Sequence, residues 1–174
     1  MEKNKAGVGI LTSDKIDFKT KAITRSKQGH CITLQGVVQQ EDITLINIYA
    51  PNIRAPSNIR KILEDFRKDI DSNTFILGHF NMPLSTMDRS SKRRINKDMV
   101  ALNDTLDKMD LIDIYRTFHS KEAKYTFFSN RHGTFSMRDH MIGHKTRLNK
   151  LKKIEIISST FSDHNGLKLD TNFK

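Results

Sequence analysis

The chain has 174 residues, the size of one domain, and a formal net charge of +10 from 30 Lys and Arg against 20 Asp and Glu. Its single cysteine, Cys31, excludes an internal disulfide and a zinc site of the cysteine type. No apolar run is long enough to cross a bilayer, and the N-terminus lacks the apolar core of a signal peptide. We therefore expect an intracellular protein, nuclear or cytoplasmic, that has no membrane partner and binds a polyanion, nucleic acid first. Plain solubility is the alternative reason for the charge.

The predicted elements begin almost at the first residue. Gly7–Thr12 reads as a strand, and Asp14–Gly29 reads as a basic loop with a weak edge strand. Two segments rich in β-branched residues, Cys31–Val38 and Ile43–Tyr49, flank the polar Gln39–Asp42. This pattern predicts a β-hairpin.

A helix is predicted over Ser57–Ile70, with Ser57 as its N-cap. Its apolar residues recur at spacings of three and four, which gives one apolar face; they are Ile59, Ile62, Leu63, Phe66 and Ile70. The short apolar run Phe75–Leu77 follows and is typical of a buried strand. The order strand, helix, strand predicts an α/β sandwich.

The second half of the chain has the same mixed character. Asp88–Arg94 is a basic loop, and Asn96 is the expected cap of a helix that runs to about Met109. The segments that follow are the short apolar Leu111–Ile114, the strand Tyr125–Ser129, the turn Asn130–Ser136, and the strands Met137–Gly143, Ile154–Ile157 and Leu167–Leu169. Because the sequence has no repeat and no linker, we expect residues 1–174 to form a single domain.

Polar residues stand at the ends of four predicted strands, where α/β proteins commonly build their sites. They are Tyr49 in Asn-Ile-Tyr-Ala-Pro, His79 and Asn81 in Gly-His-Phe-Asn, Asp139 in Arg-Asp-His, and Asp163 and His164 in Ser-Asp-His. Each motif alone has a plainer interpretation. Asp139 and His164 can form a surface ion pair, and Tyr49 can be a core aromatic.

Taken together, these motifs resemble the endonuclease/exonuclease/phosphatase family, the DNase I-like and apurinic-endonuclease-like phosphodiesterases. The likeness is strongest to the endonuclease domain of LINE-type, non-LTR retrotransposons. It includes Ile-Asp-Ile-Tyr-Arg-Thr at 112–117 and Tyr-Thr-Phe-Phe-Ser at 125–129, and it runs from about Ala6 to Leu169. The resemblance implies a two-sheet α/β (α+β) sandwich of the DNase I-like type. It also implies Mg²⁺-dependent nicking of DNA as the ancestral reaction.

The resemblance further implies a role for each polar residue. Phosphodiester hydrolysis needs a divalent cation, an activated water and donors to the charged transition state. His79 stands where the family has the aspartate that deprotonates the water. Asn81 and Tyr49 stand at the positions that contact the phosphate.

The remaining motifs correspond to the metal and to the phosphate-facing imidazole. Asp163 matches the aspartate on the metal side of the family's site. His164 matches the histidine that faces the scissile phosphate, and Asp139 matches the carboxylate that orients it.

Two departures from the family pattern bear on activity. His79 supplies no fixed anion, and it repels a metal when protonated. In addition, the resemblance starts part-way into the family's domain, so the first strands, an asparagine of the site and the glutamate that is the principal metal ligand have no counterpart. We therefore expect an N-terminally truncated relic of a retrotransposon endonuclease domain, with Mg²⁺ as ancestral cofactor and no activity as this chain alone. A missing N-terminal segment or a larger retrotransposon polyprotein would then be a partner.

Two alternatives remain open from the sequence: a non-catalytic nucleic-acid-binding remnant, and a translated fragment without function. For DNA we expect phosphate contacts from two basic stretches and from the turn between them. The residues concerned are Arg89, Arg93, Arg94, Arg131, His132, Lys145, Arg147 and Lys150. A solvated basic face is the plainer interpretation.

Overall fold

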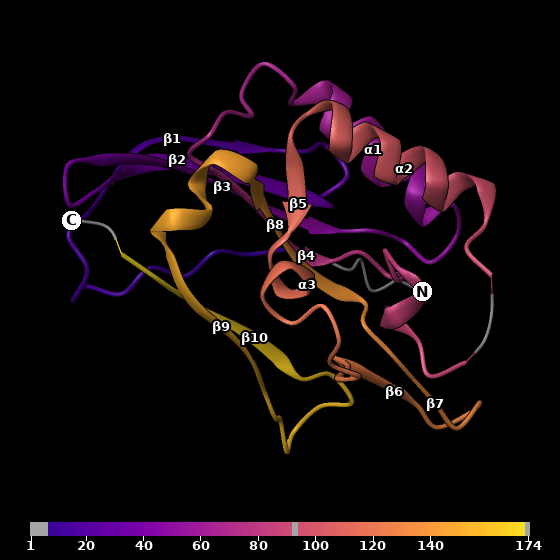
Figure 1. The fold of residues 1–174 in the computed structure, drawn as a ribbon. Helices are drawn as coiled ribbons and strands as arrows, with labels where there is room; N and C mark the ends of the chain where they lie inside the picture. Colours follow the sequence, from indigo (N-terminus) through magenta and orange to yellow (C-terminus); the bar gives the residue numbers. More distant parts are fainter. Residues whose placement is uncertain (1–6, 92–93, 173–174) are drawn as a thin grey trace, which may run out of the picture.

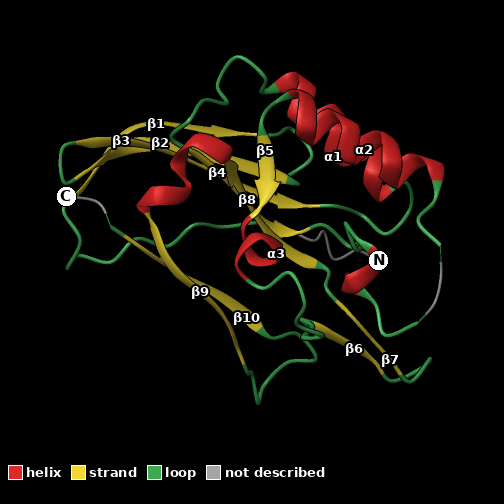
Figure 2. Ribbon diagram, viewed as in Figure 1, coloured by secondary structure: helices red, strands yellow, loops and turns green. Residues whose placement is uncertain are grey.

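The structure is a computed structural model that describes residues 7–91 and 94–172. Within these residues six strands form the main sheet, in the spatial order β1-β2-β3-β4-β8-β5 (Figures 1 and 2). In that order they are β1 (Phe18–Arg25), β2 (Cys31–Val38), β3 (Glu41–Tyr49), β4 (Thr74–His79), β8 (Asp139–His144) and β5 (Leu111–Asp113). The β3–β4 pair is parallel and the others are antiparallel, so the sheet is mixed.

The other elements surround this sheet. The helices are α1 (Ala55–Asp65), α2 (Lys97–Lys108) and the short α3 (Ile114–Phe118), with 3-10 turns η1 (Thr86–Asp88) and η2 (Lys145–Lys150). Two further antiparallel pairs are β6 (Phe127–Ser129) with β7 (Thr134–Ser136), and β9 (Leu151–Ile157) with β10 (Gly166–Thr171). In Figure 1, α1 and α2 lie together on one side of the main sheet, and β9 and β10 lie on the other.

The inner strands of the main sheet pack against other elements on both faces, whereas the edge strand β1 is largely exposed. Side chains alternate along a strand, and on β3 Ile46 and Ile48 pack in the same cluster as Ile59 of α1. Ile43 and Leu45 point the other way, into the cluster that contains β9 and β10. This arrangement confirms the predicted α/β class with two packed β-layers.

Several local predictions are confirmed. The antiparallel pairing of β2 with β3 is the predicted hairpin. Helix α2 begins after Asn96, whose side-chain oxygen accepts a hydrogen bond from the Met99 N–H at 2.9 Å. The cap satisfies one of the N–H groups that a helix start leaves without a partner.

Three local predictions are wrong. The turn predicted over Asn130–Ser136 contains the strand β7, which pairs with β6. Residues 7–12 form no strand; Gly7 and Gly9 bring no side chain to pack, and Leu11 is fully exposed. Helix α1 starts at Ala55, so Ser57 is not its N-cap, and it ends at Asp65. Pro56 explains the earlier start, because proline suits the first turn of a helix.

The described residues include no helix that is both long and apolar enough to span a bilayer.

Candidate functional site

The register of the main sheet places three of the predicted site residues in one row. Tyr49 at the end of β3 pairs with His79 at the end of β4, and His79 pairs with Asp139 at the start of β8. Residues that face each other across a ladder present their side chains on the same side of the sheet. The row therefore gathers three side chains that lie up to 90 residues apart in the sequence.

Gly78 makes this close approach possible. Its φ of 128° is a backbone conformation that favours glycine, and a Cβ at this position would overlap the carbonyl oxygen of Ile48 on β3. The adjacent strand can therefore lie against Gly78 only in the absence of a side chain. His79 follows directly, so the glycine sets where its imidazole stands.

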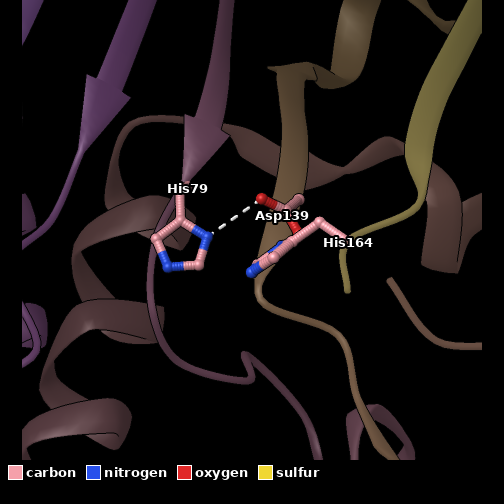
Figure 3. Close-up of side chains that lie close together, drawn as sticks. All are labelled: His79, Asp139 and His164. Atoms are coloured by element: carbon pink, nitrogen blue, oxygen red, sulfur yellow. Dashed lines mark hydrogen bonds and ion pairs between the residues drawn. The ribbon is translucent and has the colours of Figure 1, made fainter. Parts of the chain in front are cut away.

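His164 reaches the row from the loop between β9 and β10. It forms an isolated bridge with Phe127, and the two rings pack 4.8 Å apart between centroids. From there its Nδ1 lies 2.8 Å from Oδ2 of Asp139, while Nδ1 of His79 lies 3.0 Å from Oδ1 (Figure 3). Each oxygen of the one carboxylate thus meets one imidazole; we call these three residues the His-Asp-His cluster.

The cluster is partly open to solvent. The side chains of His79, Asp139 and His164 are 20%, 23% and 30% exposed. Burial raises the pKa of Asp139, but the hydrogen bonds from His79 and His164 outweigh it, so the pKa lies below its usual value. Asp139 is consequently an anion at neutral pH. Neither imidazole Nε2 makes a hydrogen bond to another described residue, and both are available to a ligand.

Tyr49 and Asn81 flank the cluster. The Tyr49 ring stacks on His79 with 5.6 Å between centroids and 21° between planes. Asn81 adopts a φ of 57°, which asparagine tolerates better than most residues. Its Oδ1 accepts a hydrogen bond from Arg138 at 3.0 Å, and its Nδ2 donates to Ala50 O at 3.4 Å.

Arg138 is a site residue that the sequence reasoning missed, although it belongs to the Arg-Asp-His motif. Its guanidinium lies 4.3 Å from the centre of the Phe127 ring and binds Asn81. Burial lowers its pKa, against the opposing charges of Asp139 and Asp163. Its place beside Asp139 in the motif is the signal that could have identified it.

A cleft of about 450 Å³ lies next to the cluster. Asn81 and Arg138 line it on the side of the site, and Arg89 and His132 line it with the β6–β7 hairpin. Serine and threonine hydroxyls contribute much of the remaining wall. The cleft therefore offers cationic and hydroxyl donors, which is the chemistry that binds phosphate oxygens.

The other predicted residues are not members of the cluster. Arg131 is exposed in the turn beside His132, and Arg94 is exposed before α2. Arg93 lies outside the described residues. Asp163 precedes His164 but is exposed, and its carboxylate makes no hydrogen bond or ion pair with a described residue.

The basic residues of η2 stand at the far end of β8, which separates them from Asp139 by about 17–20 Å of strand. Lys145 lies 3.6 Å from Asp107. Arg147 and Lys150 both bind Glu41, at 3.2 Å and 2.5 Å. The fold does not bring these three residues to the cluster, and it neutralises part of their charge.

No family model matches the sequence. The structure is similar to the endonuclease domain of TRAS1, a telomere-specific non-LTR retrotransposon, with a TM-score of 0.72 and 17% identity over 94% of this chain and 72% of that chain. It is also similar to an AP endonuclease from Archaeoglobus fulgidus (TM-score 0.71, 16% identity, 90% and 72%). A third similar structure is a 3′ phosphatase from Neisseria bound to product DNA hairpin (0.68, 16%, 92% and 71%). The chain has a DNase I-like fold.

Nucleases with a DNase I-like fold typically use a divalent metal, so the ligands available in this chain decide whether Mg²⁺ fits. Mg²⁺ demands near-ideal octahedral geometry and oxygen ligands. The His-Asp-His cluster supplies one carboxylate and two imidazoles, and imidazole nitrogen suits transition metals rather than Mg²⁺. The donor set therefore does not fit Mg²⁺.

Proposed function

We propose that this chain is a nucleic-acid-binding domain derived from a retrotransposon endonuclease, and that its Mg²⁺-dependent nicking activity is impaired. One observation carries the second part: Asp139 is shared between His79 and His164. A carboxylate that would orient one imidazole here orients two. The family has an aspartate at the position of His79, which would be a second fixed anion; His79 supplies none.

The consequence for hydrolysis is electrostatic. In metal-assisted hydrolysis the cation polarises the phosphate and lowers the pKa of the attacking water. His79 retains a nitrogen, Nε2, that can accept a proton, so general base chemistry remains open to it. A lone imidazole does not replace the charge of a cation at the transition state. We therefore expect binding of a phosphodiester without efficient cleavage.

The nucleic-acid part of the proposal rests on the cleft beside the cluster. Arg89, His132 and Arg138 line it together with Asn81. The exposed Arg131 extends this surface along the β6–β7 hairpin. We propose that DNA lies across the cleft and the hairpin, and that His132 and Arg131 are the side chains nearest the bases. Two similar structures, a retrotransposon endonuclease domain and a 3′ phosphatase bound to product DNA hairpin, support the choice of DNA as the polyanion.

A nicking assay tests the loss of activity. Supercoiled plasmid is incubated with the purified chain and Mg²⁺ or Mn²⁺, and we expect no nicking above the level of a His164→Ala control. Robust nicking that His164→Ala abolishes would contradict the proposal. His79→Asp alone should not restore nicking, because the glutamate that the family uses as principal metal ligand has no counterpart in the chain.

A binding titration separates the remaining alternatives. Fluorescence anisotropy with duplex DNA should show binding that weakens steeply as salt increases, because phosphate contacts release counterions. Binding without nicking identifies a non-catalytic binder. A folded chain that shows no binding at low salt would refute the nucleic-acid part and leave the alternative of a fragment without function.

A further inference from the structure

We propose that His79, Asp139 and His164 form a binding site for a divalent transition metal, with Zn²⁺ as the cation that best suits the ligands. Each residue offers one ligand atom, and these atoms all lie within 4.8 Å of one another. Among residues 7–91 and 94–172, no other group of three or more His, Cys, Asp or Glu meets this condition.

The spacing of the ligand atoms suits a small cation. Zn²⁺ binds imidazole nitrogen and carboxylate oxygen at about 2.0–2.2 Å, so two of its tetrahedral ligands stand roughly 3.3 Å apart. The nitrogen–oxygen distances in the cluster are 3.0 Å and 2.8 Å. A small outward shift of each imidazole would therefore open the space that the ion needs, and the main sheet would not have to rearrange.

The types of ligand select the metal class. Two imidazoles and one carboxylate suit Zn²⁺ and other first-row transition metals, whereas Mg²⁺ and Ca²⁺ prefer oxygen. Three protein ligands also leave a coordination position open to water or to a phosphate oxygen, as in catalytic rather than structural zinc sites. The open position would face the partly exposed side of the cluster.

The surroundings of the cluster favour a cation. Each oxygen of the Asp139 carboxylate faces one imidazole nitrogen, at 3.0 Å and 2.8 Å, so the carboxylate lies between the two other ligands. The positively charged Arg138 directly precedes Asp139, but it forms no ion pair with Asp139 among the described residues. Its guanidinium instead lies over Phe127 and binds Asn81. The Asp139 carboxylate therefore contacts the two imidazoles and not Arg138, and it can bind an ion that lies between the imidazoles.

The direct test is metal binding by the full chain, without nucleic acid. Isothermal titration calorimetry with Zn²⁺ should show one ion bound per chain, and a large excess of Mg²⁺ should not displace it. Co²⁺ in place of Zn²⁺ should give the intense visible absorption of a four- or five-coordinate site. An absence of Zn²⁺ binding by the folded chain would overturn the proposal.

Three variants assign the site. His79→Gln keeps a side-chain donor for Asp139 but removes the imidazole, and it should weaken Zn²⁺ binding by at least about 10–100-fold, the loss that follows even when a supporting partner of a ligand is removed. His164→Gln should have a similar effect. His132→Ala is the matched control, because it removes an exposed imidazole outside the cluster.

Each outcome decides the question. Loss of Zn²⁺ affinity in both cluster variants with full retention in His132→Ala supports the site. Unchanged affinity in either cluster variant, or equal loss in His132→Ala, shows that the ion binds elsewhere and refutes it. Thermal melts of all variants without metal identify any that fail to fold. His79→Asp or His164→Asp then replaces the failed variant at the same position, and loss of the nitrogen ligand should change the Co²⁺ spectrum. An unchanged spectrum would refute the site.

Discussion

Two neighbouring residues of β8 belong to two carboxylate–imidazole clusters, one partly exposed to solvent and the other buried. Asp139 faces the partly open side of the sheet, where it binds His79 and His164. His140 points to the side of the helices, where its Nδ1 lies 2.8 Å from Asp113 and its Nε2 lies 2.9 Å from Met82 O. His140 is only 1% exposed. The strand alternation alone separates the two clusters.

The difference shows how burial determines the role of the same pair of chemical groups. Both ring nitrogens of His140 have protein partners. Burial lowers its pKa, but Asp113, with Asp88 and the Met82 carbonyl, raises it, and the pKa lies above its ordinary value. That imidazole can only hold β5, β8 and the loop after β4 together. In the open cluster Nε2 of His79 and Nε2 of His164 remain available. The closed pair therefore serves stability, and the open one can serve a ligand.

The largest expected effect comes from breaking the closed pair. Asp113→Ala leaves a buried imidazole without its carboxylate, and it should lower the free energy of unfolding by about 3–5 kcal/mol. His164→Ala, at the open cluster, should lower it by about 1 kcal/mol or less, as for pairs near the surface. Urea denaturation of both variants measures the difference. Equal losses would mean that burial does not distinguish the clusters.

The second prediction concerns the reactivity of the Cys31 thiol, which lies on the same face of the main sheet as His140. Cys31 belongs to a core cluster, and burial raises the pKa of its thiol from 9.0 to about 11. At a given pH near neutral the thiolate fraction is then about 100-fold lower than in an exposed cysteine. Native protein should react with a thiol reagent at least that much more slowly than protein in urea. A reaction rate in the native protein close to the rate in urea would show that the core around Cys31 is accessible to the reagent.

The third prediction compares how much the two ends of β8 contribute to DNA affinity. Arg131→Glu, on the hairpin near the open cluster, should weaken duplex binding and reduce the salt slope by about one contact. Lys152→Glu makes the same charge change at an exposed position of β9, beyond η2, and should alter affinity less. Anisotropy titrations at low and physiological salt measure both. If Lys152→Glu has the larger effect, the DNA surface includes the far end of β8.

The smallest effect concerns Glu41, which is shared by Lys150 and Arg147 much as Asp139 is shared by two imidazoles. The hydrogen bond from Lys150 lowers the pKa of Glu41, against a smaller effect of burial. A lowered pKa in the folded state stabilises the protein above the ordinary value of 4.5, and the contribution disappears as the pH falls through the folded value. Glu41→Gln should thus lower the melting temperature slightly at neutral pH. The difference from the unmodified chain should vanish in acid; a constant difference would exclude this ionisation as its cause.

The sequence by itself determined the elements that depend on neighbouring residues. The β2–β3 hairpin follows from two β-branched runs around a polar turn, and α2 follows from the Asn96 cap with its apolar spacing. The order of the strand-end motifs predicted the DNase I-like class and the contact between Asp139 and His164. Local pattern was insufficient at residues 7–12, because an apolar run forms a strand only where a partner edge is available.

The tertiary structure alone decided how the site is shared. His79 and Asp139 are 60 residues apart, and only the register of β4 against β8 brings them to 3.0 Å. The same register sends His140 into the core. A strand register depends on packing between distant segments, and a slip of one residue reverses every side chain. For that reason the sharing of Asp139 between His79 and His164 could be recognised only in the complete sheet.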